Sequence, residues 1–265
     1  MGTPPDILEK LPALQPLKDH AKEAGIFLDL DGTLAELVDL PEAVRFPHAT
    51  RDLLRTLRSR FRSVVIISGR SAHSLETIVQ LPELTYVGNH GLEIVANGQR
   101  RVLLPEPHVS RMRAIEGMLP DLIEADGVAL ELKELSHAIH YRGAPDPQGA
   151  RRDILRALAS LDLQEVRILE GKFLIQIRPD AGLDKGTAVA QLVNERGLRF
   201  LLYAGDDTTD LDGFRAVDEF TAEGGGAGYR VAVSYPDTPA ALLAAADFSV
   251  PGIEGMRVVL GWMAA

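Results

Sequence analysis

Short apolar segments that alternate with helical patterns are the feature of this sequence that most restricts its fold. The segments "VVII" (64–67) and "FLLYA" (200–204) are apolar on both of the faces that a strand would present. Strands of this kind are typical of a parallel sheet that is covered by helices on both sides. We expect six of them, at residues 25–30, 63–67, 84–87, 200–204, 230–233 and 248–250.

Helical patterns lie between these strands. Apolar residues recur at intervals of about 3.6 residues in the segments 48–61, 71–80, 184–197 and 238–246. Strands that alternate with helices in this way predict an α/β fold with a Rossmann-like, doubly wound parallel sheet.

The middle of the chain departs from this alternation. From about Pro107 to Pro179 the pattern is helix, two strands, helix, two strands, which is typical of an antiparallel α+β unit (αββαββ). We therefore expect an inserted domain at residues 107–180. Residues 1–106 and 181–265 would form the two parts of the parallel domain.

Composition excludes several classes of function. The chain has no cysteine, so it forms neither disulfides nor thiolate sites. A net charge of −10 argues against a broad surface for nucleic acid or an anionic membrane. No apolar stretch approaches the roughly 18 residues of a membrane span, and no signal peptide is visible. We expect a cytoplasmic protein whose partner is a small molecule, with no indication of its oligomeric state.

Polar residues follow the predicted parallel strands at their carboxyl ends. They are Asp29 and Asp31 after the first strand, Ser68 and Arg70 after the second, Asn89, His90 and Gly91 after the third, and Asp206, Asp207 and Asp210 after the fourth. Lys185 begins the helix that precedes the fourth strand. Ligands of open parallel sheets bind beyond these strand ends, so the side chains should converge on one edge of the sheet.

Their chemistry points to phosphoryl transfer. Closely spaced carboxylates resist joint ionisation unless a positive charge lies between them, and oxygen ligands without cysteine favour Mg²⁺ over Zn²⁺. One aspartate could attack phosphorus, and a second could protonate the leaving alcohol and activate water. Lys185 would neutralise the phosphoryl charge and Ser68 would hold a phosphate oxygen. A lone pair of aspartates could instead cap a loop, but here acids and a lysine accompany it.

Several segments carry a family resemblance, which is spread over residues 29 to 214. They are "DLDGTLAEL", "ISGRS", "GNHGLE", "ELKELSHAIHYR", "GKFLIQIRP", "DKGTAV" and "GDDTTDLDGF". The chain resembles phosphatases of the haloacid dehalogenase (HAD) superfamily, and most closely the trehalose-6-phosphate phosphatase family. The resemblance implies a HAD core with an inserted C2B-type cap. It also implies Mg²⁺-dependent hydrolysis of trehalose 6-phosphate through an aspartyl-phosphate.

The resemblance also implies roles for the residues of the reaction. Asp29 would be the nucleophile and Asp31 the general acid and base, while Ser68 and Lys185 would be phosphate ligands.

A metal site is implied as well. Mg²⁺ would be held by Asp29, the carbonyl of Asp31 and Asp206, with Asp207 and Asp210 as supporting acids.

Four residues of the insertion match sugar-binding positions of the family. Glu131, Lys133 and Lys172 match its charged residues, whereas Gln176 stands where the family usually has Glu. Leu211 is a second departure, also from a usual Glu. Glu131 and Lys133 could otherwise be an exposed pair on a strand, and Lys172 a cation in a turn.

Four further residues of the core are expected to contact the substrate: Arg70, Asn89, His90 and Gly91. Two of them have an alternative interpretation. Arg70 could brace its loop, and His90 could be a structural imidazole in a turn.

Other functions remain open at this point. The same chemistry could act on another glycosyl phosphate, such as sucrose phosphate or a glucosylglycerol-type phosphate. A non-catalytic sugar-phosphate sensor would be expected to lack Asp31 or Lys185, and both are present. A phospho-accepting receiver would need neither the DxDGT motif nor the insertion.

Overall fold

The computed structural model describes residues 4–37, 44–171 and 173–265. The chain divides into two compact units. The first comprises the described residues of Met1–Arg101 and Asp184–Ala265, and the second is Val102–Leu183. The sequence pattern predicted the two borders at 106/107 and 180/181.

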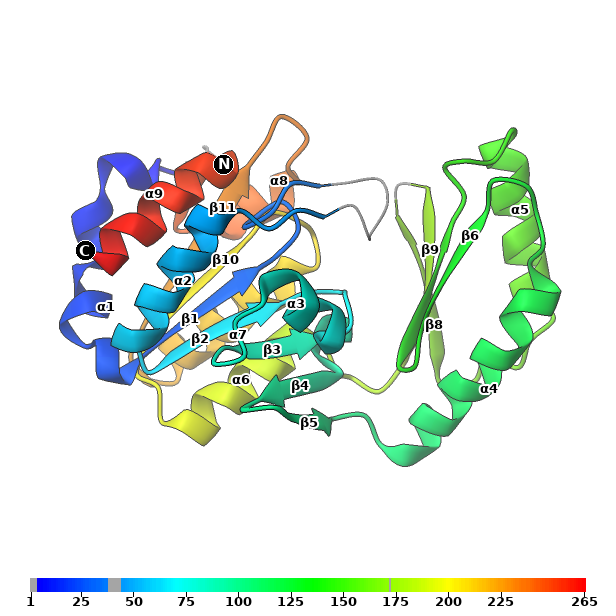
Figure 1. The fold of residues 1–265 in the computed structure, drawn as a ribbon, viewed down its shortest axis with the longest axis horizontal. Coiled ribbons are helices and arrows are strands. Elements are labelled where there is room, and N and C mark those ends of the chain that lie inside the picture. The colour runs from blue at the N-terminus through cyan, green and yellow to red at the C-terminus, as the bar shows by residue number, and fades with distance from the viewer. Residues whose placement is uncertain (1–3, 38–43, 172) are drawn as a thin grey trace. The chain divides into compact units, whose positions relative to one another are not determined.

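Within the described residues, the first unit is built on an eight-stranded sheet of order β12-β11-β10-β1-β2-β3-β4-β5 (Figure 1). The strands are β1 (Ala24–Asp29), β2 (Ser63–Ile67), β3 (Thr85–Gly88), β4 (Glu93–Ala96), β5 (Gln99–Val102), β10 (Phe200–Gly205), β11 (Ala227–Ser234) and β12 (Phe248–Pro251). Neighbours from β12 to β3 pair in parallel, and β3 pairs with β4 antiparallel.

Strand β1 is the central strand of this sheet. The chain passes from β1 to β2 and β3 on one side, and later to β10, β11 and β12 on the other. The strand order therefore reverses between β1 and β10, which confirms the doubly wound α/β fold. This reversal is the position at which such sheets place their ligands.

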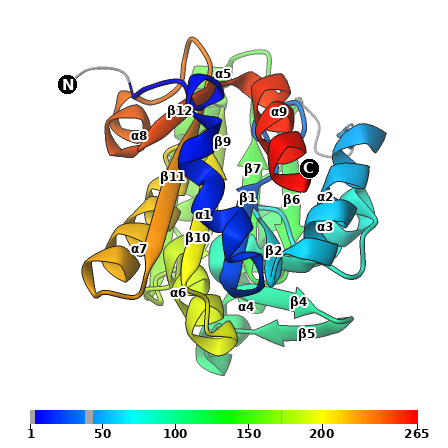
Figure 2. The ribbon, with the colours of Figure 1, turned by 90° about the vertical axis from the view of Figure 1, so that its left-hand side faces the viewer.

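Helices cover both faces of the sheet, as Figure 2 shows, with α2 and α9 on one side and α6 and α7 on the other. The α-helices of this unit are α1 (Gln15–Asp19), α2 (His48–Arg60), α3 (Ala72–Val79), α6 (Lys185–Arg196), α7 (Asp210–Ala222), α8 (Ala240–Ala245) and α9 (Gly252–Ala264). Its 3₁₀ helices are η1 (Ile7–Glu9), η2 (Leu11–Leu14), η3 (Ala21–Glu23) and η5 (Asn89–Gly91). In the described part of the chain, no helix has the length and apolar character needed to cross a membrane.

Successive side chains of a strand point to opposite faces of the sheet, and both faces are buried against helices. Ile26 and Leu28 of β1 belong to the cluster that includes Leu54 of α2 and Val259 of α9. Residues of β1 are buried at all six positions, as expected for a strand between two helical layers.

The antiparallel hairpin of β4 and β5 was not predicted. Its signal is Asn97-Gly98, whose φ values of 52° and 72° are those of a two-residue hairpin turn. The apolar alternation that predicts a strand is interrupted here by polar residues, which are Glu93 in β4 and Gln99, Arg100 and Arg101 in β5.

In its described residues, the second unit consists of two helices and a four-stranded sheet of order β6-β7-β9-β8. Its elements are α4 (Glu106–Leu122), β6 (Ala129–Lys133), β7 (Ser136–His140), α5 (Pro147–Leu158), β8 (Val166–Gly171) and β9 (Leu174–Pro179). All three strand pairs are antiparallel. Ile139, Ile175 and Ile177 pack in one buried cluster with Ile115 of α4 and Ile154 of α5. One face of the sheet is thus covered by the helices.

Two adjacent valines on α9 test how strongly the unit depends on its core. Val259 is fully buried, whereas the side chain of Val258 is 52% exposed. Val259→Ala should lower the free energy of unfolding by about 1.5–3 kcal/mol, because it removes two buried carbons and leaves a cavity. Val258→Ala should change it by less than about 0.5 kcal/mol. Urea unfolding of both variants measures the difference, and equal effects would contradict this assignment of the core.

Candidate active site

The carboxyl ends of β10, β1, β2 and β3 lie next to one another and carry the predicted polar residues. Asp29 is the last residue of β1. Ser68 directly follows β2, and Asn89 begins η5 directly after β3. Lys185 is the first residue of α6, which is fixed by a capping box in which Asp184 accepts from the amide of Thr187 at 2.8 Å. The site lies entirely within the first unit.

A buried lysine joins two of the predicted acids. The Nζ atom of Lys185 donates to Oδ1 of Asp29 and to Oδ1 of Asp210, at 2.7 Å in each case. All three side chains are buried. Burial alone would lower the pKa of Lys185, but the attraction of Asp210 and Asp29 and the hydrogen bonds to them raise it above its usual value. The ammonium is therefore charged at any physiological pH.

Three acids crowd together beside this lysine. Oxygen atoms of Asp29, Asp206 and Asp210 all lie within 4.8 Å of one another. Burial raises the pKa of Asp29 well above its usual value; Lys185 opposes this shift, and Asp210 and Asp206 add to it. Burial, followed by the charge of Asp210, raises the pKa of Asp206 to about 7. Full ionisation of the group therefore needs further positive charge, which a divalent cation would supply.

Asp210 holds the loop after β10 in place. Its Oδ1 accepts from Lys185 and from the hydroxyl of Tyr203 at 2.9 Å, and its Oδ2 accepts from the amides of Asp206 and Asp207 at 3.1 Å. Both oxygens thus already have donors, which fits a supporting acid. The carboxylate of Asp207 is outside the group of crowded acids among the described residues; it is exposed and accepts from the hydroxyl of Thr208.

The guanidinium of Arg70 binds both carboxylate oxygens of Asp31. Its Nε donates to Oδ2 at 2.7 Å and its Nη2 to Oδ1 at 2.8 Å. A guanidinium that binds both oxygens fixes the plane of a carboxylate. Arg70 was expected either to contact the substrate or to brace its loop. The structure shows its guanidinium bound to Asp31, where it orders the second aspartate of the motif.

The loops after β2 and β3 are tied to each other. The amide of Asn89 donates to the carbonyl of Arg70 at 2.7 Å, and the amide of His90 donates to the carbonyl of Ser68 at 3.0 Å. The hydroxyl of Ser68 accepts from the amide of Arg70 at 3.2 Å. His90 is buried, and its ring lies against Gly69. These bonds hold Ser68 at the strand end.

Glu93 is a buried acid that the sequence analysis did not single out. Its Oε1 accepts from the side chain of Asn89 at 2.7 Å and from the amide of Ala72 at 2.8 Å. Arg100 donates to its other oxygen at 2.5 Å. Asn89 is one of the residues expected to contact substrate, and its side-chain amide donates to Glu93. The signal for Glu93 was its place in "GNHGLE", a polar residue at the start of an apolar strand.

Gly91 allows this turn to approach helix α6. Its φ is +102°, a value that residues other than glycine rarely adopt. A β-carbon at this position would lie 2.1 Å from the carbonyl oxygen of Asp184. Gly91 therefore sets the packing of the turn against the residue that precedes Lys185.

The predicted sugar-binding residues that the structure describes gather on one face of the sheet in the second unit. Glu131 and Gln176 lie opposite Ala138 on either side of it. The Nζ atom of Lys133 is 3.5 Å from Oε2 of Glu131, and Nε2 of His140 is 3.2 Å from the same oxygen. This face is opposite the one that packs on the helices. Lys172 lies outside the described residues.

His137 faces the interior of the second unit. Its Nε2 lies 3.0 Å from the carbonyl oxygen of Met112, and burial lowers its pKa. It is a packed, hydrogen-bonded residue. His140, three residues further along the same strand, points to the other face of the sheet and contacts Glu131.

Comparison with known proteins adds to this geometry. The sequence model of the family described as trehalose-phosphatase matches residues 27–240. Trehalose-phosphate phosphatase B of Arabidopsis thaliana is 29% identical over 237 residues, which cover 83% of this chain and 62% of that protein. An uncharacterized glycosyl hydrolase of Mycobacterium tuberculosis is 32% identical over 240 residues, which cover 84% of this chain and 17% of that protein. The chain thus spans less than two thirds of the length of these relatives.

A solved structure shows the same fold. The C-terminal domain of a trehalose-6-phosphate phosphatase from C. albicans aligns over 99% of this chain and 98% of that one, with a TM-score of 0.79 and 23% identity. The family match covers most of the chain, including both aspartates after β1, Lys185 and the acids after β10. The chain belongs to the trehalose-phosphatase family.

Proposed function

We propose that this chain is a phosphatase that hydrolyses trehalose 6-phosphate to trehalose and phosphate through an aspartyl-phosphate intermediate. One observation carries the proposal: the buried ammonium of Lys185 lies 2.7 Å from Oδ1 of Asp29, at the carboxyl end of the central strand. A carboxylate so placed has a fixed direction and a positive charge beside it. Membership of the trehalose-phosphatase family supports the choice of substrate.

The first step forms the covalent intermediate on Asp29. An oxygen of its carboxylate attacks phosphorus, and the bond from phosphorus to the sugar oxygen breaks. Lys185 opposes the negative charge that gathers on the phosphoryl oxygens, and it needs no rearrangement because it is already buried beside Asp29. Ser68, buried at the end of the neighbouring strand, would donate to a phosphate oxygen.

Asp31 would move the protons of both steps. It gives a proton to the leaving sugar oxygen and then accepts one from the water that attacks the phosphoryl group. That second attack breaks the bond from phosphorus to Asp29, which leaves as a carboxylate while inorganic phosphate forms. The ion pair with Arg70 fixes the orientation of the Asp31 carboxylate before the substrate binds.

The donor set fits Mg²⁺. Carboxylate oxygens are hard ligands, and the crowded acids need a cation before they can all be charged. Asp29, Asp206 and the backbone carbonyl of Asp31 would hold the ion, with Asp210 and Asp207 as supporting acids. When bound, the ion would withdraw charge from the phosphoryl oxygens as a Lewis acid.

We propose that the second unit is a cap that binds the sugar. Glu131, Lys133 and Gln176 share the sheet face that its own helices leave uncovered. Carboxylate, ammonium and amide groups are the donors and acceptors that sugar hydroxyls need. With Lys172 they would form the sugar site.

A different glycosyl phosphate, such as sucrose phosphate, is the second candidate substrate. The observation that favours it is Gln176, which is neutral where family members usually have an acid and which lies on the same face as Glu131. The chemistry on phosphorus would be unchanged. Release of phosphate from a panel of sugar phosphates tests both candidates, and a clear preference for another sugar would overturn the assignment of trehalose 6-phosphate.

Replacing the nucleophile should stop turnover without unfolding the protein. Asp29→Asn should reduce kcat by at least about a thousandfold, because an amide does not attack phosphorus. In metal-free protein its midpoint of thermal unfolding should not fall, since burial and the neighbouring acids disfavour the charge of Asp29. The wild type should yield a phosphorylated peptide that contains Asp29 in mass spectrometry. Asp52→Asn, which changes an exposed aspartate on α2, is the control.

Chelation of divalent cations should abolish activity, and Mg²⁺ should restore it. Mg²⁺ should also raise the midpoint of thermal unfolding of metal-free protein, since a ligand that binds only the native state stabilises it. Asp206→Asn should raise the Mg²⁺ concentration needed for both effects by about tenfold or more. Full activity after exhaustive chelation would argue against the metal site.

The sugar site can be separated from the phosphate site by the choice of substrate. Glu131→Gln should lower kcat/KM for trehalose 6-phosphate by about tenfold, because charged acceptors bind hydroxyls more strongly than neutral ones. For p-nitrophenyl phosphate, which lacks the sugar, the change should be below about twofold. Glu170→Gln is a matched control, since Glu170 lies in the same sheet beside the inward-facing Ile175. Equal losses on both substrates would mean that Glu131 is structural.

A further inference from the structure

The hydroxyl of Tyr235 reaches the loop that carries the two aspartates. Tyr235 follows β11, and its hydroxyl donates to the backbone carbonyl of Gly32 at 2.7 Å. Gly32 directly follows Asp31. A residue from the far part of the chain thus holds the peptide between Gly32 and Thr33, one residue beyond the proposed general acid and base.

The backbone at Gly32 passes very close to the crowded acids. A β-carbon on Gly32, whose φ is +81°, would lie 2.1 Å from Oδ2 of Asp206. The amide of Gly32 donates to the carbonyl of Ala35 at 2.8 Å. Its two peptide groups are therefore both engaged, one within the loop and one by Tyr235. Rotation of either peptide would change the path of the loop directly after Asp31 and the spacing of that loop from Asp206.

The ring of Tyr235 lies against the start of helix α9. A β-carbon on Gly252, the first residue of α9, would lie 3.5 Å from its Cε1 atom. Burial, followed by the charge of Asp206, raises the pKa of Tyr235, so the hydroxyl keeps its proton and remains a donor. Tyr235 thus connects the start of α9 to the loop that carries Asp31.

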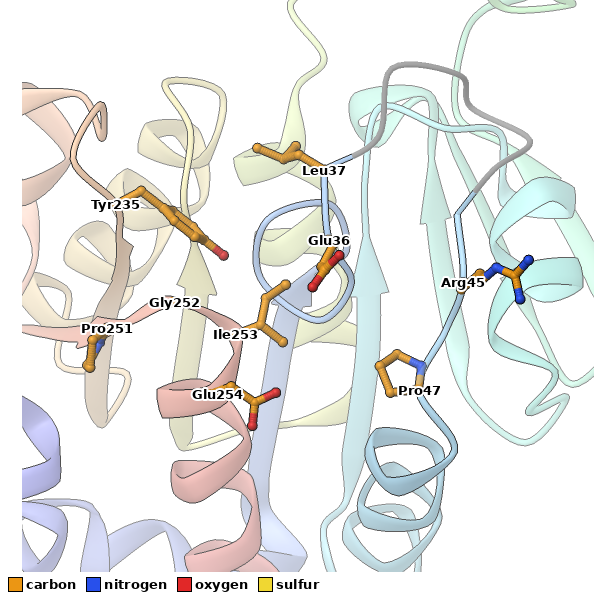
Figure 3. A pocket seen from close by; sticks show the side chains of 9 residues that line it. All are labelled: Glu36, Leu37, Arg45, Pro47, Tyr235, Pro251, Gly252, Ile253 and Glu254. Carbon is orange, nitrogen blue, oxygen red and sulfur yellow. The ribbon is translucent and has the colours of Figure 1, made fainter.

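A pocket of about 670 Å³ lies beside this link. Figure 3 shows the Tyr235 hydroxyl directed toward the segment that carries Glu36, with Ile253 nearby. Because Tyr235 lines a pocket, loss of its hydroxyl creates no sealed cavity. A phenylalanine at this position should therefore fold.

We propose that Tyr235 is a positioning residue for the phosphoryl-transfer reaction, which it serves by fixing the peptide between Gly32 and Thr33, the second peptide after Asp31. The carboxylate of Asp31 is held by Arg70, and the next two peptides are held by Ala35 and Tyr235, so the loop is fixed at and directly after this residue. This inference rests on the proposed function. Small displacements of a catalytic group can cost large factors in rate.

The test compares Tyr235→Phe with Tyr86→Phe. Each variant loses one tyrosine hydroxyl that donates to a backbone carbonyl, at 2.7 Å to Gly32 or at 2.8 Å to Leu81. Tyr86 is fully buried on β3 and contacts none of the site residues through this bond. Tyr86→Phe therefore measures the effect of a lost hydroxyl on stability alone.

Two substrates separate positioning of Asp31 from a general loss of structure. An alkyl phosphate such as trehalose 6-phosphate needs a proton on its leaving oxygen, whereas p-nitrophenolate leaves without one. Tyr235→Phe should lower kcat/KM about tenfold for the alkyl phosphate and less than about twofold for p-nitrophenyl phosphate. Tyr86→Phe should change neither value. Assays are run well below the unfolding midpoints of both variants.

An equal loss on both substrates, or no loss, in Tyr235→Phe would overturn the proposal. A wild-type protein that hydrolyses no phosphate ester would refute the proposed function instead, so the two failures are distinguishable.

Discussion

The ammonium of Lys185, held between Asp29 and Asp210, is the interaction on which the site depends. Burying an ion costs several kcal/mol, and the cost is offset only if partners surround the ion with good geometry. Lys185 meets this condition because two carboxylates accept from it at hydrogen-bonding distance. Since Asp210 also accepts from the amides after β10, the same ammonium that contacts Asp29, the proposed nucleophile, is joined to the acidic loop.

This arrangement leaves the site with more negative than positive charge. Asp29, Asp206 and Asp210 share one lysine, and burial, followed by the charge of Asp210, raises the pKa of Asp206 to about 7. A structure that stores such repulsion is less stable than it would be without it, and binding of a cation would relieve it. The trade of stability for reactivity is common at catalytic sites.

Much of the fold follows from local pattern, and the site follows only in part. The apolar strands and the DxDGT segment at the end of β1 could be located because each signal lies within a few neighbouring residues. The β4–β5 hairpin was missed because polar residues masked its alternation, although Asn97-Gly98 marks its turn. The roles of Glu93 and Tyr235 depend on partners that are distant in sequence or on the backbone, and no residue spacing reports such contacts.

The order of β1 and β10 in the sheet has a consequence for how the protein is made. β1 pairs with β10, which the ribosome supplies only after the whole of Val102–Leu183 has been synthesised. The second unit is continuous in sequence, so its strands can pair while the central strand of the first unit has only β2 as a neighbour. Closing so long a loop slows the formation of non-local contacts. Asp29, the proposed nucleophile, therefore contacts Lys185 only late in folding. Until β10 pairs with β1, one edge of β1 is exposed, and at this stage a chaperone would have most to protect.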